Sequence, residues 1–320
     1  MLTARAFWMV GEGVGEIREE AFAPPGPSEV LVETLYSAVS RGTESLVFHG
    51  RVPASEHERM RAPHQAGAFP FPVKYGYLNV GRVVLGPSEL RGREVFCLYP
   101  HQTRYVVAAD AVVPLPPGVP PARAVLAGNL ETAINGLWDA EVKVGDRVAV
   151  VGAGVVGALV AYLAGRIPGC RVELVDVEPA RARLAAALGV AFAAPGAAQT
   201  DADVVLHTSG APEGLRTALA LAGTESTIVE MSWYGQGTTE VHLGGAFHSR
   251  RLTLRSSQVG GLPPSQRPRW SPRRRLELAL SLLTDPVLDV LLEEESSFDD
   301  LPTVLPQLTS CLCHRVRYSP

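Results

Sequence analysis

Cysteine is scarce in this chain of 320 residues, and its spacing excludes a disulfide framework. The four cysteines are Cys97, Cys170, Cys311 and Cys313. They form no C-x-x-C pair, which favours buried or incidental thiols in a reducing compartment. The first 13 residues also lack the basic region, apolar core and cleavage site of a secretory signal peptide. We therefore expect a cytoplasmic protein.

The chain also lacks an excess of positive charge and a long apolar run. Its 29 Lys and Arg residues against 33 Asp and Glu residues give a net charge of −4, so no basic footprint indicates a nucleic acid partner. The most apolar stretch, Val148–Ala164, contains three glycines and is shorter than the ~20 residues of a membrane span. At 320 residues the chain is long enough for two domains with separate cores. We expect a small-molecule partner and no membrane.

The sequence does contain a glycine-rich turn between an apolar strand and a helical segment. Val148–Val151 has the composition of a buried strand, and Gly152, Gly154 and Gly157 follow it as G-x-G-x-x-G. In this motif the first glycine permits a tight turn and the second lets a pyrophosphate approach the backbone. The third lets the helix pack closely on the strand. This context predicts the dinucleotide-binding turn of a Rossmann fold.

Residues beyond the glycines indicate which dinucleotide binds. The helix opens with Val155 and Val156, whose backbone N–H groups would face the phosphates. A second apolar strand ends on Asp176, close to the ~20-residue spacing at which a carboxylate accepts from the ribose hydroxyls of NAD. At ~4 Å and an effective dielectric of about 20, that carboxylate would repel a 2′-phosphate by about 4 kcal/mol. Arg181 is the opposing signal, since an arginine there can hold a 2′-phosphate; we expect NAD, with NADP as the alternative.

The rest of the chain divides into a mainly-β region and an alternating α/β region. Short strand-like runs between Pro- and Gly-rich turns occur at Arg5–Met9, Val30–Tyr36, Val80–Leu85, Glu94–Leu98 and Arg104–Val107. After a proline-rich segment at Pro114–Pro121, the pattern predicts helices over Ala122–Leu137, Pro179–Leu188, Glu213–Leu221 and Arg273–Leu283. It predicts strands at Val172–Val175, Val204–Thr208, Thr227–Ser232, Leu252–Ser257 and Arg315–Tyr318, with a short helix within Phe298–Thr309. The expected domains are residues 1–119, completed by 287–320, and residues 120–286.

A β domain, a Rossmann core and a return to the first domain resemble the plan of the medium-chain dehydrogenase/reductase superfamily. Val144-Gly145-Asp146-Arg147-Val148 is similar to that family's entry into its cofactor domain. The resemblance implies an α/β protein with a GroES-like mainly-β catalytic domain and a Rossmann domain built on a doubly wound parallel sheet. It further implies an alcohol dehydrogenase or carbonyl reductase, and a homodimer joined through sheet edges near Leu252–Ser257.

Shorter motifs carry the resemblance to particular residues. His207-Thr208-Ser209-Gly210 resembles the turn that passes under the nicotinamide, which implies Thr208, Ser209 and Gly210 as cofactor contacts. Glu131-Thr132-Ala133 resembles the helix start whose Thr touches the nicotinamide. Ser40-Arg41-Gly42-Thr43-Glu44 and Tyr75-Gly76-Tyr77 are similar to the branch that contains 2-desacetyl-2-hydroxyethyl bacteriochlorophyllide a dehydrogenase. That branch oxidises a secondary alcohol on a large planar ring.

The catalytic-zinc ligands of the metal-dependent members of that superfamily are missing here. The first ligand position falls on Ser40 or Arg41, the second on Tyr77 and the third on Gly128. None of these residues offers the thiolate, imidazole or carboxylate that zinc prefers. The clustered cysteines of the structural-zinc lobe are missing as well. The resemblance therefore implies a zinc-independent member.

Without a metal, hydroxyl groups are candidates for moving the proton that accompanies hydride transfer. Tyr77 is the first catalytic candidate, because its phenol would occupy part of the metal position. The further candidates are Ser40, Thr43 and Glu44. The ordinary tyrosine pKa of ~10 would need lowering by a nearby cation, for which Lys74 and Arg41 are available. The alternative is that Tyr77 only fills the space.

Other polar residues are candidates for the substrate pocket. They are Arg41, Lys74, Asn129, Glu131, Trp233 and Tyr234. The last two follow the fifth Rossmann strand at the carboxyl edge, where open α/β sheets bind ligands. Glu131 would either orient a substrate or cap its helix. A basic run ending at Arg275 opens a predicted helix and favours a solvent-exposed face, with an anionic partner as the alternative.

The sequence thus predicts an NAD-dependent, zinc-independent oxidoreductase. It would transfer a hydride between the nicotinamide and an alcohol or carbonyl carbon in a cleft between its domains, and the branch implies a secondary alcohol on a ring system. One alternative is an NAD(P)H-dependent quinone or enone reductase. Another is a nucleotide-binding sensor or structural protein without catalysis. Polar residues at the former metal position favour the enzyme.

Overall fold

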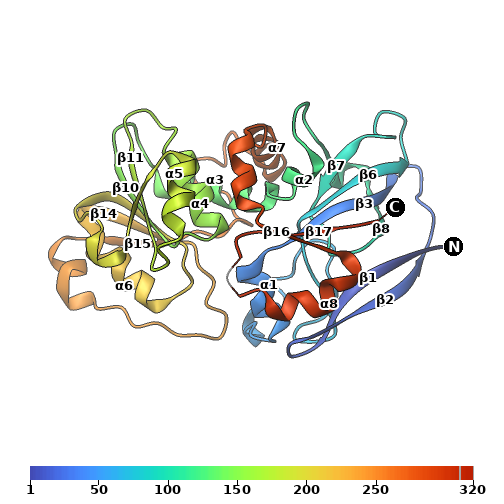
Figure 1. Cartoon of the computed structure of the whole chain (residues 1–320), viewed down its shortest axis with the longest axis horizontal. Helices are drawn as coiled ribbons and strands as arrows, with labels where there is room; N and C mark the ends of the chain where they lie inside the picture. Colours follow the sequence, from blue (N-terminus) through green and yellow to red (C-terminus); the bar gives the residue numbers. More distant parts are fainter. Residues whose placement is uncertain (310, 320) are drawn as a thin grey trace. The chain divides into compact units, whose positions relative to one another are not determined.

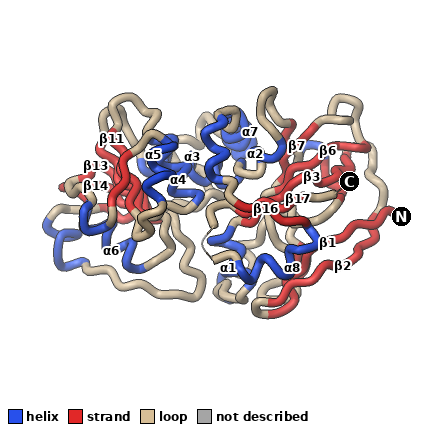
Figure 2. The backbone as a smooth tube through the Cα atoms, viewed as in Figure 1, coloured by secondary structure: helices blue, strands red, loops and turns tan. Residues whose placement is uncertain are grey.

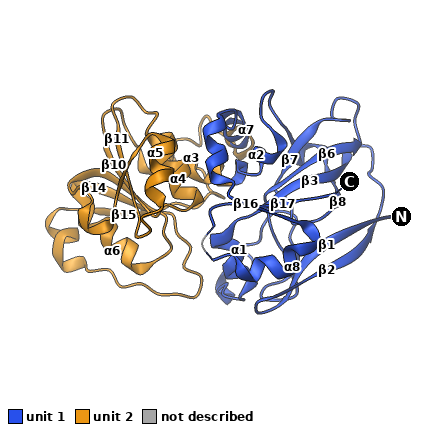
Figure 3. Cartoon of the chain, viewed as in Figure 1, with its two compact units in different colours: residues 1–128, 276–320 blue, residues 129–275 orange. Residues whose placement is uncertain are grey.

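The structure is a computed structural model that describes residues 1–309 and 311–319. It contains two compact units, Met1–Gly128 with Leu276–Pro320 and Asn129–Arg275, which Figure 3 shows in blue and orange. The chain therefore leaves the first unit once and returns to it. The sequence predicts domain boundaries after residues 119 and 286. The structure divides instead after Gly128 and Arg275.

The first unit is built on two sheets, drawn in red in Figure 2. The smaller has the order β2-β1-β5-β4. Its strands are β1 (Leu2–Gly11), β2 (Val14–Phe22), β4 (Ala66–Gly67) and β5 (Val73–Lys74). The larger has the order β16-β17-β3-β6-β7-β9, and β8 pairs with β3 off that path. Its strands are β3 (Glu29–Val39), β6 (Asn79–Leu85), β7 (Glu94–Cys97), β8 (Arg104–Ala108), β9 (Val113–Pro114), β16 (Glu294–Ser297) and β17 (His314–Arg317).

The larger sheet holds the core of the first unit. Its buried cluster consists of Val30, Val32, Val83, Val95, Cys97, Tyr105, Val107 and Val112. These β-branched and aromatic side chains fit a pleated, buried surface. The helices of this unit are short: α1 (Arg41–Phe48), α2 (Pro121–Ala124) and α8 (Leu301–Val304), with α7 (Pro272–Leu282) at the point where the chain returns. Because α1 follows β3 directly, its first turn lies at the end of a central strand of this sheet.

The second unit is a parallel sheet in which strands alternate with helices (Figure 1). Its six strands run β12-β11-β10-β13-β14-β15, which is the Rossmann order 3-2-1-4-5-6. They are β10 (Arg147–Val151), β11 (Arg171–Val175), β12 (Ala191–Ala193), β13 (Ala202–His207), β14 (Ala222–Glu230) and β15 (Thr253–Ser256). The helices are α3 (Ala127–Ala140), α4 (Val155–Ala164), α5 (Arg181–Leu188) and α6 (Pro212–Leu221). Apolar residues of β10, β13 and β14 pack with those of α6 to form its core.

The predicted elements match the structure closely, with a few exceptions. The expected helix over Ala122–Leu137 is divided into α2 and α3, and the helical stretch within Phe298–Thr309 consists of single turns around α8. The apolar run Val148–Ala164 is shared between β10, the glycine turn and α4. Among the described residues, no helix combines the length and apolarity needed to cross a membrane.

Candidate active site

The glycine turn of the second unit has the backbone and the space that a dinucleotide needs. Gly152 follows β10 with φ +108°, and a Cβ there would lie 2.6 Å from the backbone nitrogen of Ser209. A Cβ on Gly157 would lie 1.8 Å from the carbonyl oxygen of Gly152, so α4 packs directly on the turn. A Cβ on Gly154, by contrast, would meet no atom of the described chain within 4 Å. The outer glycines are required by the fold, and the middle one leaves its backbone open to a pyrophosphate.

The start of α4 belongs to the same turn. Gly154 is the N-cap of this helix, Val155 and Val156 are its first residues, and the cap makes no side-chain hydrogen bond. The first N–H groups of a helix lack partners within it, and the positive end of the helix dipole favours an anion. These groups fit the phosphates of a dinucleotide.

Asp176 follows β11 and turns its carboxylate toward the glycine turn. Its Oδ2 accepts a hydrogen bond from the backbone N–H of Ala153 at 2.6 Å, and Oδ1 accepts one from Glu178 at 2.9 Å. The side chain is half-buried. Each carboxylate oxygen has a second lone pair, so it can also accept from a ribose hydroxyl. Arg181 begins α5, just beyond this strand end.

The turn after β13 lies against the glycine turn. The hydroxyl of Thr208 donates to the carbonyl oxygen of Gly152 at 2.9 Å. His207 is fully buried, with Nδ1 2.7 Å from Glu230 Oε2 and Nε2 2.6 Å from Ser209 Oγ. Burial raises the pKa of Glu230, but the hydrogen bonds it accepts, chiefly from His207, outweigh burial and leave the pKa below its ordinary value. The buried histidine therefore holds Ser209 beside the glycine turn.

The end of β14 is connected to this turn. The backbone N–H of Gly210 donates to Ser232 Oγ at 3.0 Å. Trp233 and Tyr234 come next in the chain and are both half-buried. The hydroxyl of Tyr234 donates to Glu230 Oε2 at 3.1 Å, the oxygen that also contacts the buried histidine. The predicted contacts on the two turns thus form one network.

Glu131, a candidate for orienting the substrate, is part of a buried ion pair. Its Oε1 lies 3.0 Å from Arg275 Nε, and the two side chains are 7% and 3% exposed. Arg275 also donates to Asn135 Oδ1. The expectation that Arg275 belongs to a solvent-exposed basic face is therefore wrong, because the fold pairs it with a buried acid. The neighbouring candidates on α3 are Asn129, which is buried, and Thr132, which is half-buried.

Hydroxyl groups meet in the first unit, where Tyr77 OH donates to Ser40 Oγ at 2.6 Å. Thr43 also makes a side-chain hydrogen bond with the Tyr77 phenol. We refer to Ser40, Thr43 and Tyr77 as the hydroxyl cluster. A Cβ on Gly128 would lie 3.8 Å from Tyr77 Cδ2. The positions that the sequence resemblance assigns to zinc ligands are therefore close together.

The hydroxyl cluster does not fit a zinc ion. Zinc in proteins takes thiolate, imidazole or carboxylate ligands. The cluster offers two alcohols and a phenol, and Gly128 has no side chain to contribute. Burial raises the pKa of Tyr77 to about 12, so the phenol holds its proton at neutral pH. We derive no step through a metal at this position.

The candidate cations do not serve Tyr77. Lys74 is buried, and its Nζ donates at 2.7 Å to Glu20 Oε2 and at 2.7 Å to a glutamine side chain. Arg41 donates to a backbone carbonyl oxygen near the end of the chain. Desolvation by burial is the main cause of the high Tyr77 pKa, and the hydrogen bonds with Ser40 and Thr43 lower it only in part. The expectation that a cation lowers this pKa is wrong.

Glu44 lies in a buried chain of hydrogen bonds. Its Oε1 accepts from the backbone N–H of Ser40 at 2.7 Å, and its Oε2 lies 2.9 Å from His101 Nε2. His101 Nδ1 lies 2.7 Å from Ser37 Oγ, which is 2.9 Å from Tyr318 OH. Each side chain in this series of hydrogen bonds has a partner if His101 carries its proton on Nε2. Ser37 then donates to His101 Nδ1 and accepts from Tyr318. Glu44 thus holds Ser40 in place through the backbone and is itself fixed by a histidine.

Comparison with known proteins bears on the fold and on the class of enzyme. No protein-family model matches the chain. The curated D-guloside 3-dehydrogenases of Shigella flexneri and Escherichia coli K12 are each 26% identical to it over 294 residues, or 82% of this chain and 83% of the relative. These alignments span both units.

Solved structures show the same fold. A zinc-binding dehydrogenase from Sinorhizobium meliloti 1021, bound to NADP, has a TM-score of 0.79 at 20% identity and covers 99% of this chain and 100% of its own. L-idonate 5-dehydrogenase from Escherichia coli also has a TM-score of 0.79, at 17% identity, and covers 99% and 98%. The predicted combination of a mainly-β domain and a parallel-sheet domain is confirmed. The curated relatives and these solved structures are dehydrogenases, in agreement with the prediction of an enzyme.

Proposed function

We propose that this chain is an NAD-preferring oxidoreductase that transfers a hydride between the nicotinamide and an alcohol or carbonyl carbon, with the hydroxyl cluster in place of a catalytic zinc. The observation that carries the proposal is the 2.6 Å contact between Tyr77 and Ser40, two positions that the sequence resemblance assigns to zinc ligands. The glycine turn and Asp176 support the cofactor. A bound nicotinamide would accept the hydride in alcohol oxidation and give it in carbonyl reduction.

The cofactor preference rests on the charge at the end of β11. Asp176 presents a carboxylate beside the turn, where it would accept from the ribose hydroxyls and repel a 2′-phosphate. Thr208, Ser209 and Gly210 would contact the nicotinamide half, and the start of α4 would hold the pyrophosphate. The relative from Sinorhizobium meliloti binds NADP, so the proposal of NAD depends on this one carboxylate.

The hydroxyl cluster would move the proton that accompanies hydride transfer. Tyr77 keeps its proton at neutral pH, since burial raises its pKa to about 12. During reduction its hydrogen would turn from Ser40 to the carbonyl oxygen of the substrate and stabilise the charge that develops there, while Ser40 donates to the phenol in exchange. During oxidation Tyr77 takes the alcohol proton while it passes its own to Ser40 Oγ, so a free phenolate is never formed. Ser40, which is half-buried, would release its own hydroxyl proton to water in the same step, so both hydroxyls end neutral.

Thr43 and Glu44 support this transfer in different ways. The Thr43 side chain hydrogen bonds to the phenol and helps to orient it. Glu44 is 0% exposed and accepts from the Ser40 backbone, so it is a positioning residue that does not touch the substrate. His101 anchors the carboxylate of Glu44 from the other side.

The substrate that we propose is a secondary alcohol on a ring. The curated relatives are dehydrogenases of D-guloside at position 3, and the motifs around Ser40 and Tyr77 resemble a branch that acts on a ring substituent. A hydroxyl cluster without a metal suits such a substrate, because hydrogen bonds can orient a polar ring as well as polarise its reacting oxygen.

We also propose a homodimer formed through β15, the last strand of the six-stranded sheet. All four of its residues are exposed, including the apolar Leu254. An exposed strand edge is a template for pairing with another chain. Sedimentation should give a dimer for the natural chain and a monomer for Leu254→Lys, which places a charge on the exposed strand and leaves its backbone pairing with β14 unchanged. A natural chain that sediments as a monomer would contradict this part of the proposal.

Turnover of the Tyr77→Phe variant tests the proposal. Initial rates with NAD and a panel of cyclic secondary alcohols, methyl glycosides among them, should fall by about 100-fold or more, as is typical for the loss of a general acid–base group. The dissociation constant of NADH should stay unchanged. Tyr75→Phe is the matched control, because Tyr75 is a buried tyrosine with its ring 6.1 Å from that of Tyr77. Natural turnover in Tyr77→Phe would reduce Tyr77 to a packing role.

Metal independence has its own test. Protein treated with EDTA and passed through a desalting column should keep its full rate of turnover. A rate that disappears with EDTA and returns with zinc, while the melting temperature stays unchanged, would contradict the metal-free mechanism.

A further inference from the structure

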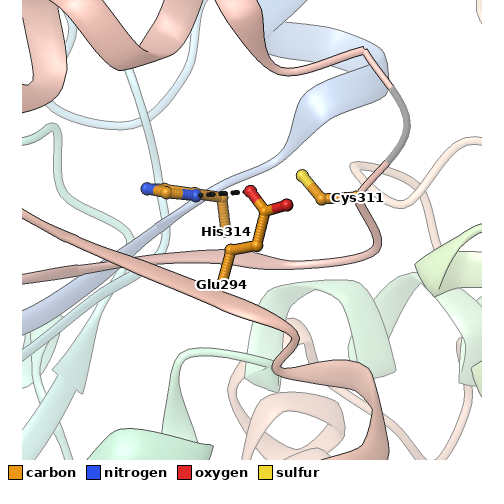
Figure 4. A group of neighbouring side chains, drawn as sticks. All are labelled: Glu294, Cys311 and His314. Atoms are coloured by element: carbon orange, nitrogen blue, oxygen red, sulfur yellow. Dashed lines mark hydrogen bonds and ion pairs between the residues drawn. The ribbon is translucent and has the colours of Figure 1, made fainter.

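Outside the hydroxyl cluster, three potential metal ligands converge in the first unit. They are Glu294 on β16, Cys311 in the segment before β17, and His314 at the start of β17. Their ligand atoms all lie within 4.8 Å of one another. Figure 4 shows the carboxylate of Glu294 between the imidazole and the thiol. Because β16 and β17 are parallel and Glu294 is in register with His314, the backbone itself brings two of the three together.

The spacing fits a tetrahedral metal. Zinc binds nitrogen and carboxylate oxygen at ~2.0–2.1 Å, and two such bonds at a tetrahedral angle place the nitrogen and the oxygen about 3.4 Å apart. The distance between His314 Nδ1 and Glu294 Oε2 is 3.4 Å. This value is long for a hydrogen bond between an imidazole and a carboxylate. The pair thus has the separation of two ligands on one ion.

The surroundings support metal binding as well. His314 Nε2 lies 2.8 Å from Ser296 Oγ, which orients the ring and leaves Nδ1 directed at Glu294. Metal-bound histidines almost always use their other nitrogen for such a hydrogen bond. Both Cys311 and His314 are buried, while Glu294 is exposed to solvent.

We propose that Glu294, Cys311 and His314 form a zinc site, distinct from the hydroxyl cluster. Thiolate, imidazole and carboxylate are the three ligand types that zinc takes in proteins. A hollow of about 560 Å³, lined in part by Glu294, Ser296 and His314, adjoins the trio and leaves room for water as a fourth ligand. The Cys311 thiol loses its proton to solvent when the metal–sulfur bond forms.

The expected role of this zinc is to stabilise the C-terminal segment, in which the chain returns to the first unit. It would connect β16 with the segment that leads into β17, and β17 in turn pairs with β3, where His314 is opposite Val39. Metal binding that requires the folded arrangement stabilises it by mass action. The hydride transfer proposed above does not depend on this zinc, so the two proposals can fail separately.

The test uses the full-length chain, stripped with EDTA and titrated with zinc chloride. The natural protein should bind one zinc per chain, measured by mass spectrometry of the metal after dialysis. Cys311→Ser and His314→Gln should each weaken binding by about 100-fold, and Ser296→Ala by about 10-fold, since it removes only the outer hydrogen bond. Cys313→Ser is the matched control: Cys313 is also buried, two residues away, and is not in the trio. It should bind zinc like the natural chain.

Two further measurements test which residues bind the zinc. Cobalt(II) in place of zinc should give a thiolate charge-transfer band that Cys311→Ser lacks and Cys313→Ser retains. Zinc should also protect Cys311 of the natural protein from alkylation, as read by peptide mass spectrometry, which needs no variant to fold. Equal zinc affinity of Cys311→Ser and Cys313→Ser, or unprotected Cys311 at saturating zinc, would overturn the proposal. Turnover is measured on the same samples, and full activity of zinc-free Cys311→Ser would leave the metal-free hydride transfer standing.

Discussion

The charge of Asp176 offers a direct test of the cofactor proposal. The carboxylate accepts from two backbone N–H groups, those of Ala153 and Glu178, so it is both a part of the turn and a ligand for the ribose. Replacement by asparagine keeps the size of the side chain and removes its charge. One of the two backbone hydrogen bonds is lost as well, because an amide has only one acceptor oxygen. That structural cost weakens NADH and NADPH alike.

The ratio of the two affinities therefore isolates the electrostatic effect. A carboxylate ~4 Å from a 2′-phosphate repels it by about 4 kcal/mol at an effective dielectric of 20 and by about 1 kcal/mol in bulk water. Asp176 is half-buried, so a value between these limits applies. We expect Asp176→Asn to shift the preference toward NADPH by roughly 10-fold to 100-fold, which corresponds to about 1.4–2.8 kcal/mol.

Dissociation constants of NADH and NADPH, measured by quenching of tryptophan fluorescence, give this ratio. The control is Asp203→Asn, because Asp203 lies near the start of β13, at the opposite end of the strand from the cofactor turn, and pairs with Arg147. Its substitution should leave the ratio unchanged. A ratio that moves less than about twofold in Asp176→Asn would refute the role of this carboxylate in cofactor choice.

Three further predictions follow from buried contacts. Gly157→Ala places a Cβ 1.8 Å from the carbonyl oxygen of Gly152, so it should abolish NADH binding and lower the melting temperature, whereas a protein that still binds NADH would show that the turn can open. Arg275→Met leaves Glu131 buried without its partner and should cost about 3–5 kcal/mol in urea unfolding, much of which the added change Glu131→Gln should restore. Burial raises the pKa of Tyr77 to about 12, above the ~10 of tyrosine in an unfolded chain. Between about pH 10 and pH 12 the folded protein therefore keeps this proton and the unfolded chain loses it. The free energy of unfolding should fall with rising pH over this range by up to about 2–3 kcal/mol more in the natural chain than in Tyr77→Phe. Parallel urea curves for the two proteins over that range would exclude a raised pKa.

The cofactor turn could be predicted because its signal is local. Three glycines, a preceding strand and an acid at a fixed spacing lie within about 30 residues, and each glycine has a separate steric reason. The structure assigns the same reasons: Gly152 has a positive φ, Gly157 has no room for a Cβ, and Gly154 is open. The strand order follows from the alternation of strands and helices, since right-handed crossovers leave few arrangements.

The proton-transfer site could be predicted only in outline. Ser40 and Tyr77 were expected near one another from the motif positions, but Glu44 and His101 are 57 residues apart, and their contact depends on the register of the sheet. A lone histidine in a sequence gives no sign of its partner. Lys74 illustrates the opposite error, because it is close to Tyr77 in sequence yet pairs with Glu20 across the smaller sheet.

Zinc should bind at Glu294, Cys311 and His314 and not at the hydroxyl cluster, and the pKa of Tyr77 explains the difference. Binding zinc through the phenol at pH 7 would require its proton to leave, which costs about 7 kcal/mol for a pKa of about 12. A structural zinc site releases about 10–16 kcal/mol on binding. The deprotonation of Tyr77 would cancel roughly half of that free energy, and the phenolate would provide only one ligand. Cys311 must lose a proton as well, and burial raises the pKa of its thiol, but the thiolate is a ligand type that zinc prefers and the phenolate is not. Zinc that copurifies with the chain is therefore expected at Cys311, and X-ray absorption of that zinc should contain one sulfur neighbour; a shell of oxygen and nitrogen alone would point to another site.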